Sequence, residues 1–468
     1  MKVEGGYHSC WPMLLFGRSA LRLVAAQPRE RFVDYTRAGL TGLGLVGSQR
    51  HFCRAVVKSP DETATGFLTL TINDKNTYTG NVVAGKPNGR GIMTWVDGRV
   101  YDGEWRDGMC DGTGSYAFPN GTLYVGDWRE GKQEGRGKMA YADGIIYDGA
   151  YKENRREGRG KMMYAKGDIY DGEWKDDLKD GKGTYSEANG TVYEGDWRMG
   201  KKEGMGKLTW KDGRVYEGGF RDGKREGWAK MTYANKTLYE GSWRDGKREG
   251  RGKMAFQNGA VYEGDWRDNK QAGTGRMTYT TGDLYEGGFV NDKKEGRGRT
   301  TFSSGDVYEG EYRNGKRNGV GKLTMSSGLV FEGEWKDDKR ASQSRMVYVD
   351  GDVYDGDIVQ GKAEGVGKML FASGDIYEGG WINNMHQGIG KFTWLDGAVY
   401  EGGWEFNEME GKGRMTWADG KVYEGGFVEG RAEGRGVLKD AGGKVIQRGM
   451  WRCGGYVGMC GPARRVAK

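Results

Sequence analysis

One phrase of 23 residues returns along most of this chain without an insertion or deletion. The copy that begins at Tyr239 reads YEGSWRDGKREGRGKMAFQNGAV, and an aromatic residue opens every copy from Tyr78 to Tyr423. The spacing makes sixteen units, which together span residues 78–445. A fixed period of roughly 20 to 50 residues is typical of repeat architectures, in which one unit cannot bury its apolar face alone.

Glycines and aromatic residues keep fixed places when each unit is counted from its opening aromatic residue as position one. Position three is Gly in all sixteen units, and positions twelve, fourteen and twenty-one are Gly in at least fourteen. Position five is aromatic in fourteen units, the exceptions being Val82 and Ile358. Position eight is always Gly, Asn or Asp, residue types that tolerate a positive φ. We therefore expect a left-handed turn at position eight.

The periodicity predicts two strands in each unit. The stretch 261–266, VYEGDW, alternates rings and glycine with acids, which is the period of a strand. The stretch 275–279, GRMTY, predicts a second strand, so each unit is a β-hairpin closed by a loop such as DGKREG. Glycines at positions three and fourteen would let rings lie flat against bare backbone.

The link between units is expected to be a three-residue loop such as 142–144, ADG. Such a loop pairs position eighteen with position twenty-two and keeps every ring on one face of the sheet. It ends on a left-handed residue, which position twenty-one supplies as Gly. One unit carries Lys236 there, and we expect the preceding Asn235 to take over the strained angle.

The expected fold is all-β: an elongated, twisted, single-layer antiparallel sheet of tandem 23-residue β-hairpin repeats, with an aromatic trough along one face. Composition agrees, with 88 Gly, only 6 Pro and 12% aromatic residues. At about 4.8 Å per strand, sixteen hairpins would span about 150 Å. Open sheets of that size twist and curl.

The recurring pattern Y-E-G-x-W-x-x-G-K-x-x-G-x-G resembles the MORN repeat, the membrane occupation and recognition nexus, over residues 78–445. The resemblance implies a ribbon of β-hairpins and a non-catalytic scaffold. Related proteins occur in cytoskeletal collars and rings, in the radial spokes of cilia and flagella, and in proteins that join membranes. The family also includes fusions to enzymes, for which the ends of this chain are too short.

The flanks depart from the pattern. Residues 1–65 form a non-repeat extension, whose apolar, Arg-rich stretch WPMLLFGRSALRLVAAQPRERF is either disordered or a short amphipathic anchor or presequence. Residues 66–77 resemble a half unit that caps the first edge strand. Residues 446–468 begin a partial unit, slipped by one residue, and end in a basic tail. Unit 331–353, with serines at positions twelve and fourteen, is either a decayed unit or a joint between eleven units and four.

No catalytic group, cofactor or metal site is expected. The three histidines lie far apart, and only His386 falls within the array, where we expect it in a hairpin loop. The stretch GDWRMGKK at 195–202 imitates a phosphate-binding loop but lacks the following Ser or Thr and helix. Five scattered cysteines suggest a reducing compartment rather than a disulfide framework. Residues 78–445 hold 58 basic and 60 acidic residues, a poor footprint for nucleic acid.

Two sets of residues are candidates for binding. The first set is an aromatic trough, read as the core of a one-layer sheet and also as a candidate site for a partner helix or peptide: Tyr216, Phe220, Tyr239, Trp243, Tyr262, Trp266, Tyr285 and Phe289. Substitution of its tryptophans is expected to abolish partner recovery without unfolding the chain. The second set is a row of basic hairpin loops, read either as a solvated edge or as a contact for anionic phospholipids: Lys201, Lys202, Lys224, Arg225, Lys247, Arg248, Lys293, Lys294, Lys316 and Arg317.

The sequence thus favours a non-enzymatic scaffold of a cytoskeletal or ciliary-flagellar assembly. Its expected location is the cytoplasm, at the cytoskeleton, a cilium, a flagellum or a basal body. Expected partners are cytoskeletal or axonemal proteins and a second copy, joined through an open sheet end. The alternative is a peripheral membrane protein that binds phosphoinositides through the basic loops.

Overall fold

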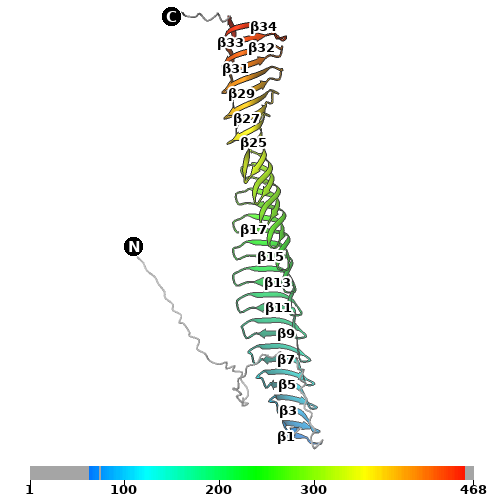
Figure 1. Ribbon diagram of the computed structural model, residues 1–468. Coiled ribbons are helices and arrows are strands. Elements are labelled where there is room, and N and C mark those ends of the chain that lie inside the picture. The colour runs from blue at the N-terminus through cyan, green and yellow to red at the C-terminus, as the bar shows by residue number, and fades with distance from the viewer. Residues whose placement is uncertain (1–62, 73–74, 459–468) are drawn as a thin grey trace, which may run out of the picture. The chain divides into compact units, whose positions relative to one another are not determined.

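A single antiparallel sheet contains every regular element of the part of the chain that the computed structural model describes, residues 63–72 and 75–458. The sheet has 35 strands, and the strands follow one another in sequence order from β1 to β35 (Figure 1). Each strand pairs with the next one along the chain, as β16 does with β17 and β17 with β18. The predicted one-layer, all-β sheet of tandem hairpins is confirmed.

Each unit contributes a leading strand, which carries positions one to six, and a returning strand, which carries positions nine to seventeen. The leading strands are β2 Asn76–Val83, β4 Val100–Arg106, β6 Leu123–Arg129, β8 Ile146–Lys152, β10 Ile169–Lys175, β12 Val192–Arg198, β14 Val215–Arg221, β16 Leu238–Arg244, β18 Val261–Arg267, β20 Leu284–Val290, β22 Val307–Arg313, β24 Val330–Lys336, β26 Val353–Val359, β28 Ile376–Ile382, β30 Val399–Glu405 and β32 Val422–Val428. The returning strands are β3 Lys86–Thr94, β5 Met109–Ala117, β7 Lys132–Ala140, β9 Arg155–Met163, β11 Leu178–Ser186, β13 Lys201–Thr209, β15 Lys224–Thr232, β17 Lys247–Ala255, β19 Lys270–Thr278, β21 Lys293–Thr301, β23 Lys316–Thr324, β25 Lys339–Val347, β27 Lys362–Leu370, β29 Met385–Thr393, β31 Glu408–Thr416 and β33 Arg431–Lys439. The flanking strands are β1 Gly66–Ile72, β34 Val445–Arg452 and β35 Gly455–Gly458.

The turn inside each hairpin is shorter than the sequence suggested. Arg106 pairs directly with Met109, and the two residues between them, Asp107 and Gly108, have φ of 48° and 80°. Positive φ at both central residues is the mark of a type I′ turn, which matches the twist of the flanking strands. The left-handed residue at position eight is confirmed, but DGKREG is not a six-residue loop. Its last four residues begin the returning strand.

A bulge in every hairpin explains the glycine at position twelve. In the pairing of β16 with β17, Gly241 lies opposite Gly252, but the next pair is Trp243 with Arg248. Three residues of the returning strand therefore face one residue of the leading strand. Gly250, at position twelve, has a φ of 81° within this bulge, a conformation that other residues rarely adopt.

The link between units is the expected three-residue loop. The backbone N–H of Trp95, at position eighteen, donates to the carbonyl of Arg99, at position twenty-two, over 2.9 Å. Gly98, at position twenty-one, has a φ of 88°. The expectation for unit 216–238 was wrong, because Lys236 itself takes the left-handed angle, with a φ of 68°. Asn235 instead accepts a hydrogen bond from the backbone N–H of Thr237 through its side-chain oxygen, over 3.1 Å.

Both flanks extend the sheet. β1 pairs with β2 from Gly66 opposite Val82 to the end of the strand, so the half unit covers the first edge of the array. At the other end the pairing of β33 with β34 shifts by one residue near Lys439, which places Trp451 opposite Gly434. That is the place of a position-five ring. The anchor or presequence suggested within residues 1–62 lies outside the described residues.

Candidate partner-binding trough

The floor of the trough is a ring laid across two glycines, and it repeats in nearly every unit. A Cβ added to Gly252, at position fourteen, would lie 2.6 Å from Cε2 of Tyr239, and one at Gly241, at position three, 2.5 Å from the Cα of Gly252. The Tyr239 hydroxyl donates to the carbonyl of Ser242 over 3.0 Å. Burial raises the pKa of this hydroxyl. The expected role of these glycines, to let rings lie flat on bare backbone, is therefore confirmed.

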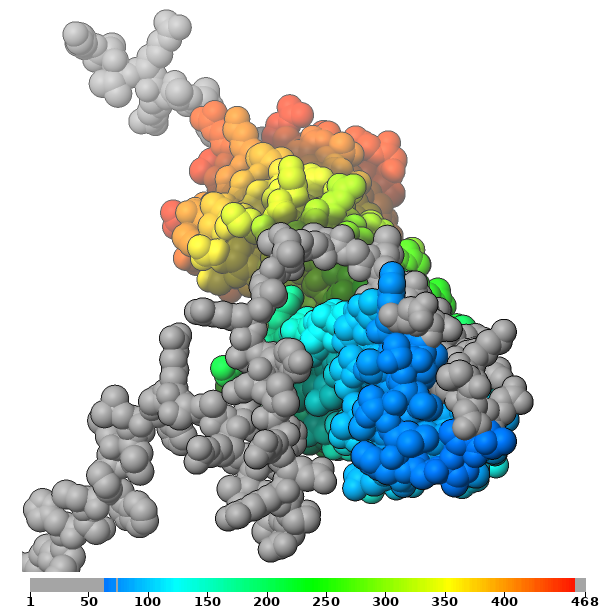
Figure 2. Space-filling view, turned by 90° about the horizontal axis from the view of Figure 1, so that it is seen from below, coloured from blue at the N-terminus to red at the C-terminus, as the bar shows by residue number. Residues whose placement is uncertain are grey.

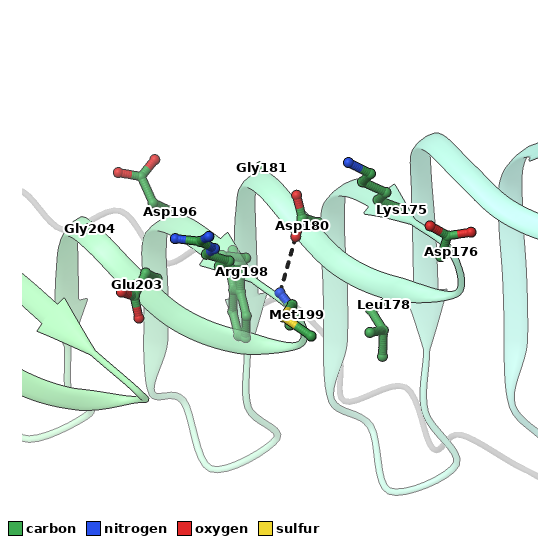
Figure 3. A pocket seen from close by; sticks show the side chains of 11 residues that line it. Lys175, Asp176, Leu178, Asp180, Gly181, Asp196, Arg198, Met199, Glu203 and Gly204 are labelled. Atoms are coloured by element: carbon green, nitrogen blue, oxygen red, sulfur yellow. Dashed lines mark hydrogen bonds between the residues drawn. The ribbon is translucent and has the colours of Figure 1, made fainter.

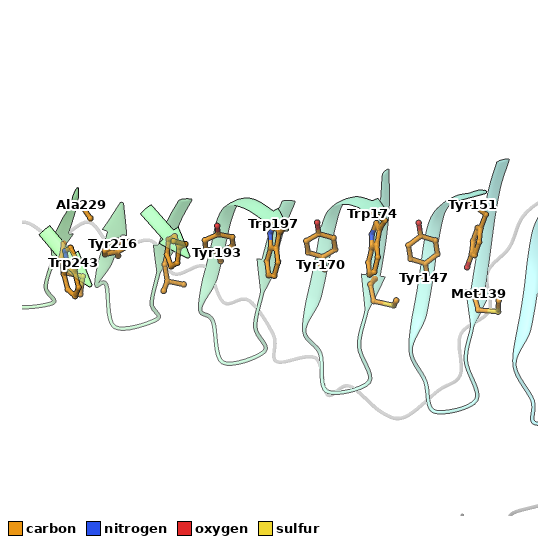
Figure 4. Close-up of a cluster of buried hydrophobic side chains, with 14 of the residues drawn as sticks. Met139, Tyr147, Tyr151, Tyr170, Trp174, Tyr193, Trp197, Tyr216, Ala229 and Trp243 are labelled. Atoms are coloured by element: carbon orange, nitrogen blue, oxygen red, sulfur yellow. The ribbon is translucent and has the colours of Figure 1, made fainter. Parts of the chain in front are cut away.

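Rings of neighbouring units meet edge to face along most of the array. The Tyr262 centroid lies 5.3 Å from that of Trp266 in its own unit, and the Tyr239 centroid lies 5.2 Å from the same Trp266 in the next unit. Figure 4 shows this alternation from Tyr151 toward Trp243. Such edge-to-face pairs add about 0.5–1.5 kcal/mol each beyond the burial of their area. The row explains how a one-layer sheet has a core.

Indole N–H groups tie consecutive units together. Trp266 Nε1 donates to the carbonyl of Gly252 in the preceding unit over 3.1 Å, and seven other position-five tryptophans make the same bond. Trp243 differs: its Nε1 is buried without a hydrogen-bond partner. The preceding unit carries Ala229 in place of the position-fourteen glycine, and a Cβ at Gly218 would lie within 3 Å of it. The extra methyl group of Ala229 therefore lies in the unit directly before Trp243, the one position-five tryptophan of the sixteen described units whose indole N–H makes no hydrogen bond.

All eight residues of the predicted trough lie in this row of rings. None of them is more than 5% exposed. They form the core of the sheet, and a partner would meet the half-buried side chains that lie above them, at positions ten and eighteen. Because the rings are core residues, substitution of Trp243 or Trp266 is expected to destabilise the sheet as well as any partner contact.

The ten basic residues named from the sequence divide into two rows of different character. The five at position nine are exposed and lie away from the rings: Lys201, Lys224, Lys247, Lys293 and Lys316. Four of them form ion pairs with the next unit's position-seven Asp, as Lys247 Nζ does with Asp268 over 2.6 Å. The Asp268 carboxylate raises the pKa of Lys247. We call this set the outer cations.

The other five are half-buried against the rings: Lys202, Arg225, Arg248, Lys294 and Arg317. The Arg248 guanidinium carbon lies 4.2 Å from the Trp266 centroid, and Lys294 Nζ lies 4.5 Å from that of Tyr285. Burial lowers the pKa of Lys294. We call the position-ten cations of residues 147–353 the inner cations, a set that also includes Arg156, Lys179 and Arg340.

The acids that follow the basic pairs do not neutralise the inner cations. Glu249, at position eleven, accepts the backbone N–H of Asp268 through Oε2 over 3.0 Å. Equivalent bonds from Glu203 and Glu226 hold the turns of their next units over 3.0 and 3.1 Å. These carboxylates therefore act as staples between hairpins. The sequence could not show this role, because a Glu next to Lys and Arg is equally consistent with a local counter-charge for those two residues.

The opposite face of the sheet carries a ladder of ion pairs. A position-fifteen cation faces a position-two acid of the next unit in ten consecutive steps, with N–O distances of 2.6–3.9 Å. The pairs are Lys207–Glu217, Lys230–Glu240, Lys253–Glu263, Arg276–Glu286, Arg299–Glu309, Lys322–Glu332, Arg345–Asp355, Lys368–Glu378, Lys391–Glu401 and Arg414–Glu424. The repeated carboxylates are thus a solvated face with cross-strand partners.

A shallow depression interrupts the outer row. It has a volume of about 710 Å³ and lies between the turns of the units that begin at Tyr170 and Tyr193. Here Leu178 and Met199 take the positions of the outer Lys and its Asp, and both side chains are exposed (Figure 3). The Met199 backbone N–H donates to Asp180 over 3.1 Å.

His386 is not in a loop, contrary to the sequence expectation. It occupies position ten in β29 because the hairpin turn is only two residues long. Its ring stacks on Tyr377 at a centroid distance of 3.7 Å, and burial lowers its pKa to about 4. Nδ1 is buried without a hydrogen-bond partner. Among the described residues no three His, Cys, Asp or Glu side chains are grouped to hold a metal ion.

Unit 331–353 interrupts the row of rings. Phe331 replaces the opening Tyr, and the Ser344 hydroxyl donates to the carbonyl of Ala341 over 3.1 Å. In unit 354–376 the corresponding carbonyl, that of Glu364, accepts from the Tyr354 hydroxyl over 3.2 Å. The Ser344 hydroxyl thus takes the carbonyl that a tyrosine hydroxyl binds in unit 354–376, so Phe331 and Ser344 are a matched pair. The buried core divides into two clusters at this unit.

These features define a class: a tandem β-hairpin repeat protein in which the same ring-and-glycine contacts recur along one sheet. The family model for the MORN repeat matches sixteen successive segments, from residues 78–98 to residues 423–445. The chain belongs to the MORN repeat family, a non-enzymatic repeat module that serves in interactions. The resemblance noted from the sequence is confirmed.

Comparisons with individual proteins add little. No curated protein matches the chain. The TCP10 domain of Danio rerio CPAP is 15% identical with a TM-score of 0.28, over 47% of this chain and 99% of the domain. The TCP domain of Drosophila melanogaster SAS-4, solved with a proline-rich motif of Ana2, is 14% identical with a TM-score of 0.21, over 43% and 90%. A streptogramin B lyase has a TM-score of 0.10 at 14% identity, over 74% and 92%. These likenesses are too weak to carry an argument.

In the stretch that the structure describes, no helix has the length and apolar character needed to cross a membrane.

Proposed function

We propose that this protein is a non-enzymatic scaffold of a cytoskeletal or ciliary-flagellar assembly, and that it binds protein partners along its trough. One observation carries the proposal: the same ring-and-glycine contact recurs unit after unit along one sheet. The repeat presents equivalent contact points at a spacing of about 10 Å, two strands apart. A rigid row of equivalent points suits an organiser, whereas an enzyme needs one unusual site.

Detergent extraction of cells that carry a tagged copy tests this proposal. The protein should stay on a discrete insoluble structure, such as an axoneme, a basal body or a cortical ring. Complete release by detergent would contradict the scaffold and favour a membrane-bound protein. A variant cut after unit 170–192 serves as control, since a shorter row should be retained less well.

Self-association through a sheet end is a second part of the proposal. In the described residues β1 pairs with β2 alone, and its Phe67 is 70% exposed. Figure 2, seen from the β1 end, shows the blue atoms of these first strands nearest the viewer. An open edge with an exposed ring is a template for a second strand. Phe67→Lys should shift a dimer toward monomer in light scattering. An unchanged mass would contradict a dimer through this end.

The alternative is a peripheral membrane protein that reads phosphoinositides. The exposed outer cations favour it, because they lie at the hairpin turns and recur in successive units. Their ion pairs with Asp weaken the attraction to a lipid surface. Binding to phosphatidylinositol bisphosphate vesicles that falls steeply with salt would support this alternative. Binding that does not depend on salt would count against it.

A further inference from the structure

The inner cations are confined to one part of the array. Eight of the nine units between residues 147 and 353 carry Lys or Arg at position ten. The exception is Gln271, which is 7% exposed at the same place. The units on either side carry other residue types at this position: Pro87, Cys110 and Gln133 before, and Ala363, His386, Met409 and Ala432 after. The cations are therefore confined to the middle of the trough.

Folding does not require these cations. Seven units form the same hairpin with another residue type at position ten, and Gln271 forms it inside the cationic stretch. Burial of a charge without a counter-charge costs free energy. A row of half-buried cations that the fold can do without calls for another reason, and binding is the usual one.

Most inner cations lack a carboxylate partner in the described part of the chain. Arg156 and Arg317 form ion pairs with Asp177 and Asp338 over 3.1 and 3.2 Å. The other six have no carboxylate in ion-pair range: Lys179, Lys202, Arg225, Arg248, Lys294 and Arg340. In the described residues the repeated ion-pair ladder lies on the opposite face, and the position-seven carboxylates pair with outer cations such as Lys247. Six half-buried cations inside the trough are thus left without a carboxylate partner.

Aromatic rings hold these cations in place. Lys179 Nζ lies within 4.0–5.4 Å of the centroids of four rings, those of Tyr164, Tyr170, Tyr185 and Trp197. Burial lowers the pKa of Lys179 to about 8. The nearby Asp168 is already bound by the Tyr185 hydroxyl and by the backbone N–H of Ala188. The Arg340 guanidinium lies 3.9 Å above Phe331, and its Nη1 is buried without a hydrogen-bond partner.

We propose that the middle of the trough, from residue 147 to residue 353, binds an acidic peptide segment of a partner protein, whose carboxylates pair with the inner cations. This inference rests on the proposed function, and it adds the chemistry of the partner and the place where it binds. One cation per unit gives a spacing of about 10 Å, which matches every third residue of an extended chain. A bilayer is the weaker candidate. Its headgroups would meet the exposed outer cations before the half-buried inner ones.

Fluorescence anisotropy with a labelled peptide that has Glu at every third residue tests the proposal. The inner variant is Lys202→Gln, Arg225→Gln, Arg248→Gln and Lys294→Gln. The matched outer variant is Lys201→Gln, Lys224→Gln, Lys247→Gln and Lys293→Gln, in the same four strands. The two variants lose the same charge, and Gln at position ten has precedents in Gln133 and Gln271. Circular dichroism checks that both fold.

The inner variant should bind the Glu peptide at least about tenfold more weakly than the native chain. The outer variant should change the affinity by less than about threefold. Equal losses in the two variants, or a Gln version of the peptide that binds as well, would overturn the proposal. So would an inner variant that loses binding to phosphatidylinositol bisphosphate vesicles while the native chain ignores the peptide. If detergent still leaves the inner variant on its insoluble structure, the scaffold stands and only the acidic partner fails.

Discussion

The eleven units before residue 331 and the four units after residue 353 share one fold and differ in what lines the trough. Both regions lay Tyr across paired glycines and pack rings edge to face, as Tyr239 with Trp266 and Tyr377 with Trp404 do. Only the first region carries inner cations. The second has residues such as Ala363 and His386 at the same position. The floor of the trough is therefore required by the fold, whereas the residues that line the trough above it can vary and are free to serve binding.

The shared floor predicts equal damage in both regions. Gly252→Val and Gly390→Val each place a side chain on a buried tyrosine, since a Cβ at either position would lie 2.6 Å from the ring. Each substitution should cost about 3 kcal/mol of local stability. Hydrogen exchange should speed up in β16–β18 for the first and in β28–β30 for the second. Glu240→Val, on the opposite face, is the control. Faster hydrogen exchange in only one of the two variants would contradict a floor that both regions share.

The matched pair in unit 331–353 predicts a coupling. Phe331→Tyr puts a hydroxyl against the Ser344 side chain, and Ser344→Gly removes the serine's hydrogen bond to Ala341. Each single change should destabilise β24 and β25, while the double variant recreates the arrangement of the other units. The interaction energy should be about 1–2 kcal/mol in a double-mutant cycle. Additive effects would show that the two residues are independent and that the unit is merely decayed.

Arginines introduced at position ten of the second region should strengthen binding of the Glu peptide. His386→Arg and Met409→Arg place guanidinium groups beside Trp381 and Trp404, the rings that these positions pair with across the hairpin. The affinity for the Glu peptide should rise by roughly threefold to tenfold. Met385→Arg and Glu408→Arg, one residue earlier and on the outer row, are the control. If the affinity for the Glu peptide rose only in the control variant, the binding surface would lie on the outer row and not in the trough.

His386 predicts a pH dependence that belongs to the second region alone. Its folded pKa of about 4 lies below the usual value of 6.5, because burial among Tyr377, Trp381 and Trp404 disfavours its charged form. The unfolded chain therefore binds the proton more readily. Stability should fall as the pH drops from about 6.5 toward 4. Between pH 7 and pH 5 the melting temperature of the His386→Gln variant should fall by a few degrees less than that of the native chain. An unchanged loss would contradict the buried neutral ring.

Most of the fold could be predicted from the sequence, because glycine and ring positions repeat sixteen times and each copy checks the others. The best examples are the three-residue link, whose length keeps every ring on one face of the sheet, and the flat packing of rings on glycine. The hairpin turn was the main error, since Asp107 and its equivalents take a positive φ that only the type I′ geometry reveals. The Lys236 angle was missed for a related reason. Its turn is imposed by the pairing on either side, which overrides a residue's own preference.

The candidate site was predicted less well, and the turn is the cause. With a six-residue loop, neighbours such as Lys247 and Arg248 look like one basic cluster. The two-residue turn places them in a strand, where successive side chains point to opposite faces. One becomes an exposed partner of Asp268, and the other stacks on Trp266. The same alternation carried His386 from a supposed loop into the core.

The most direct test of the account uses adjacent lysines as reporters. Acetylation of the native chain, followed by mass spectrometry, can be compared with and without the Glu peptide at Lys201 and Lys202 and at Lys293 and Lys294. The account predicts that the peptide slows modification of Lys202 and Lys294 and leaves Lys201 and Lys293 nearly unchanged. Equal slowing within each pair, or protection of the outer lysines alone, would contradict a trough that uses its inner cations to hold an acidic partner.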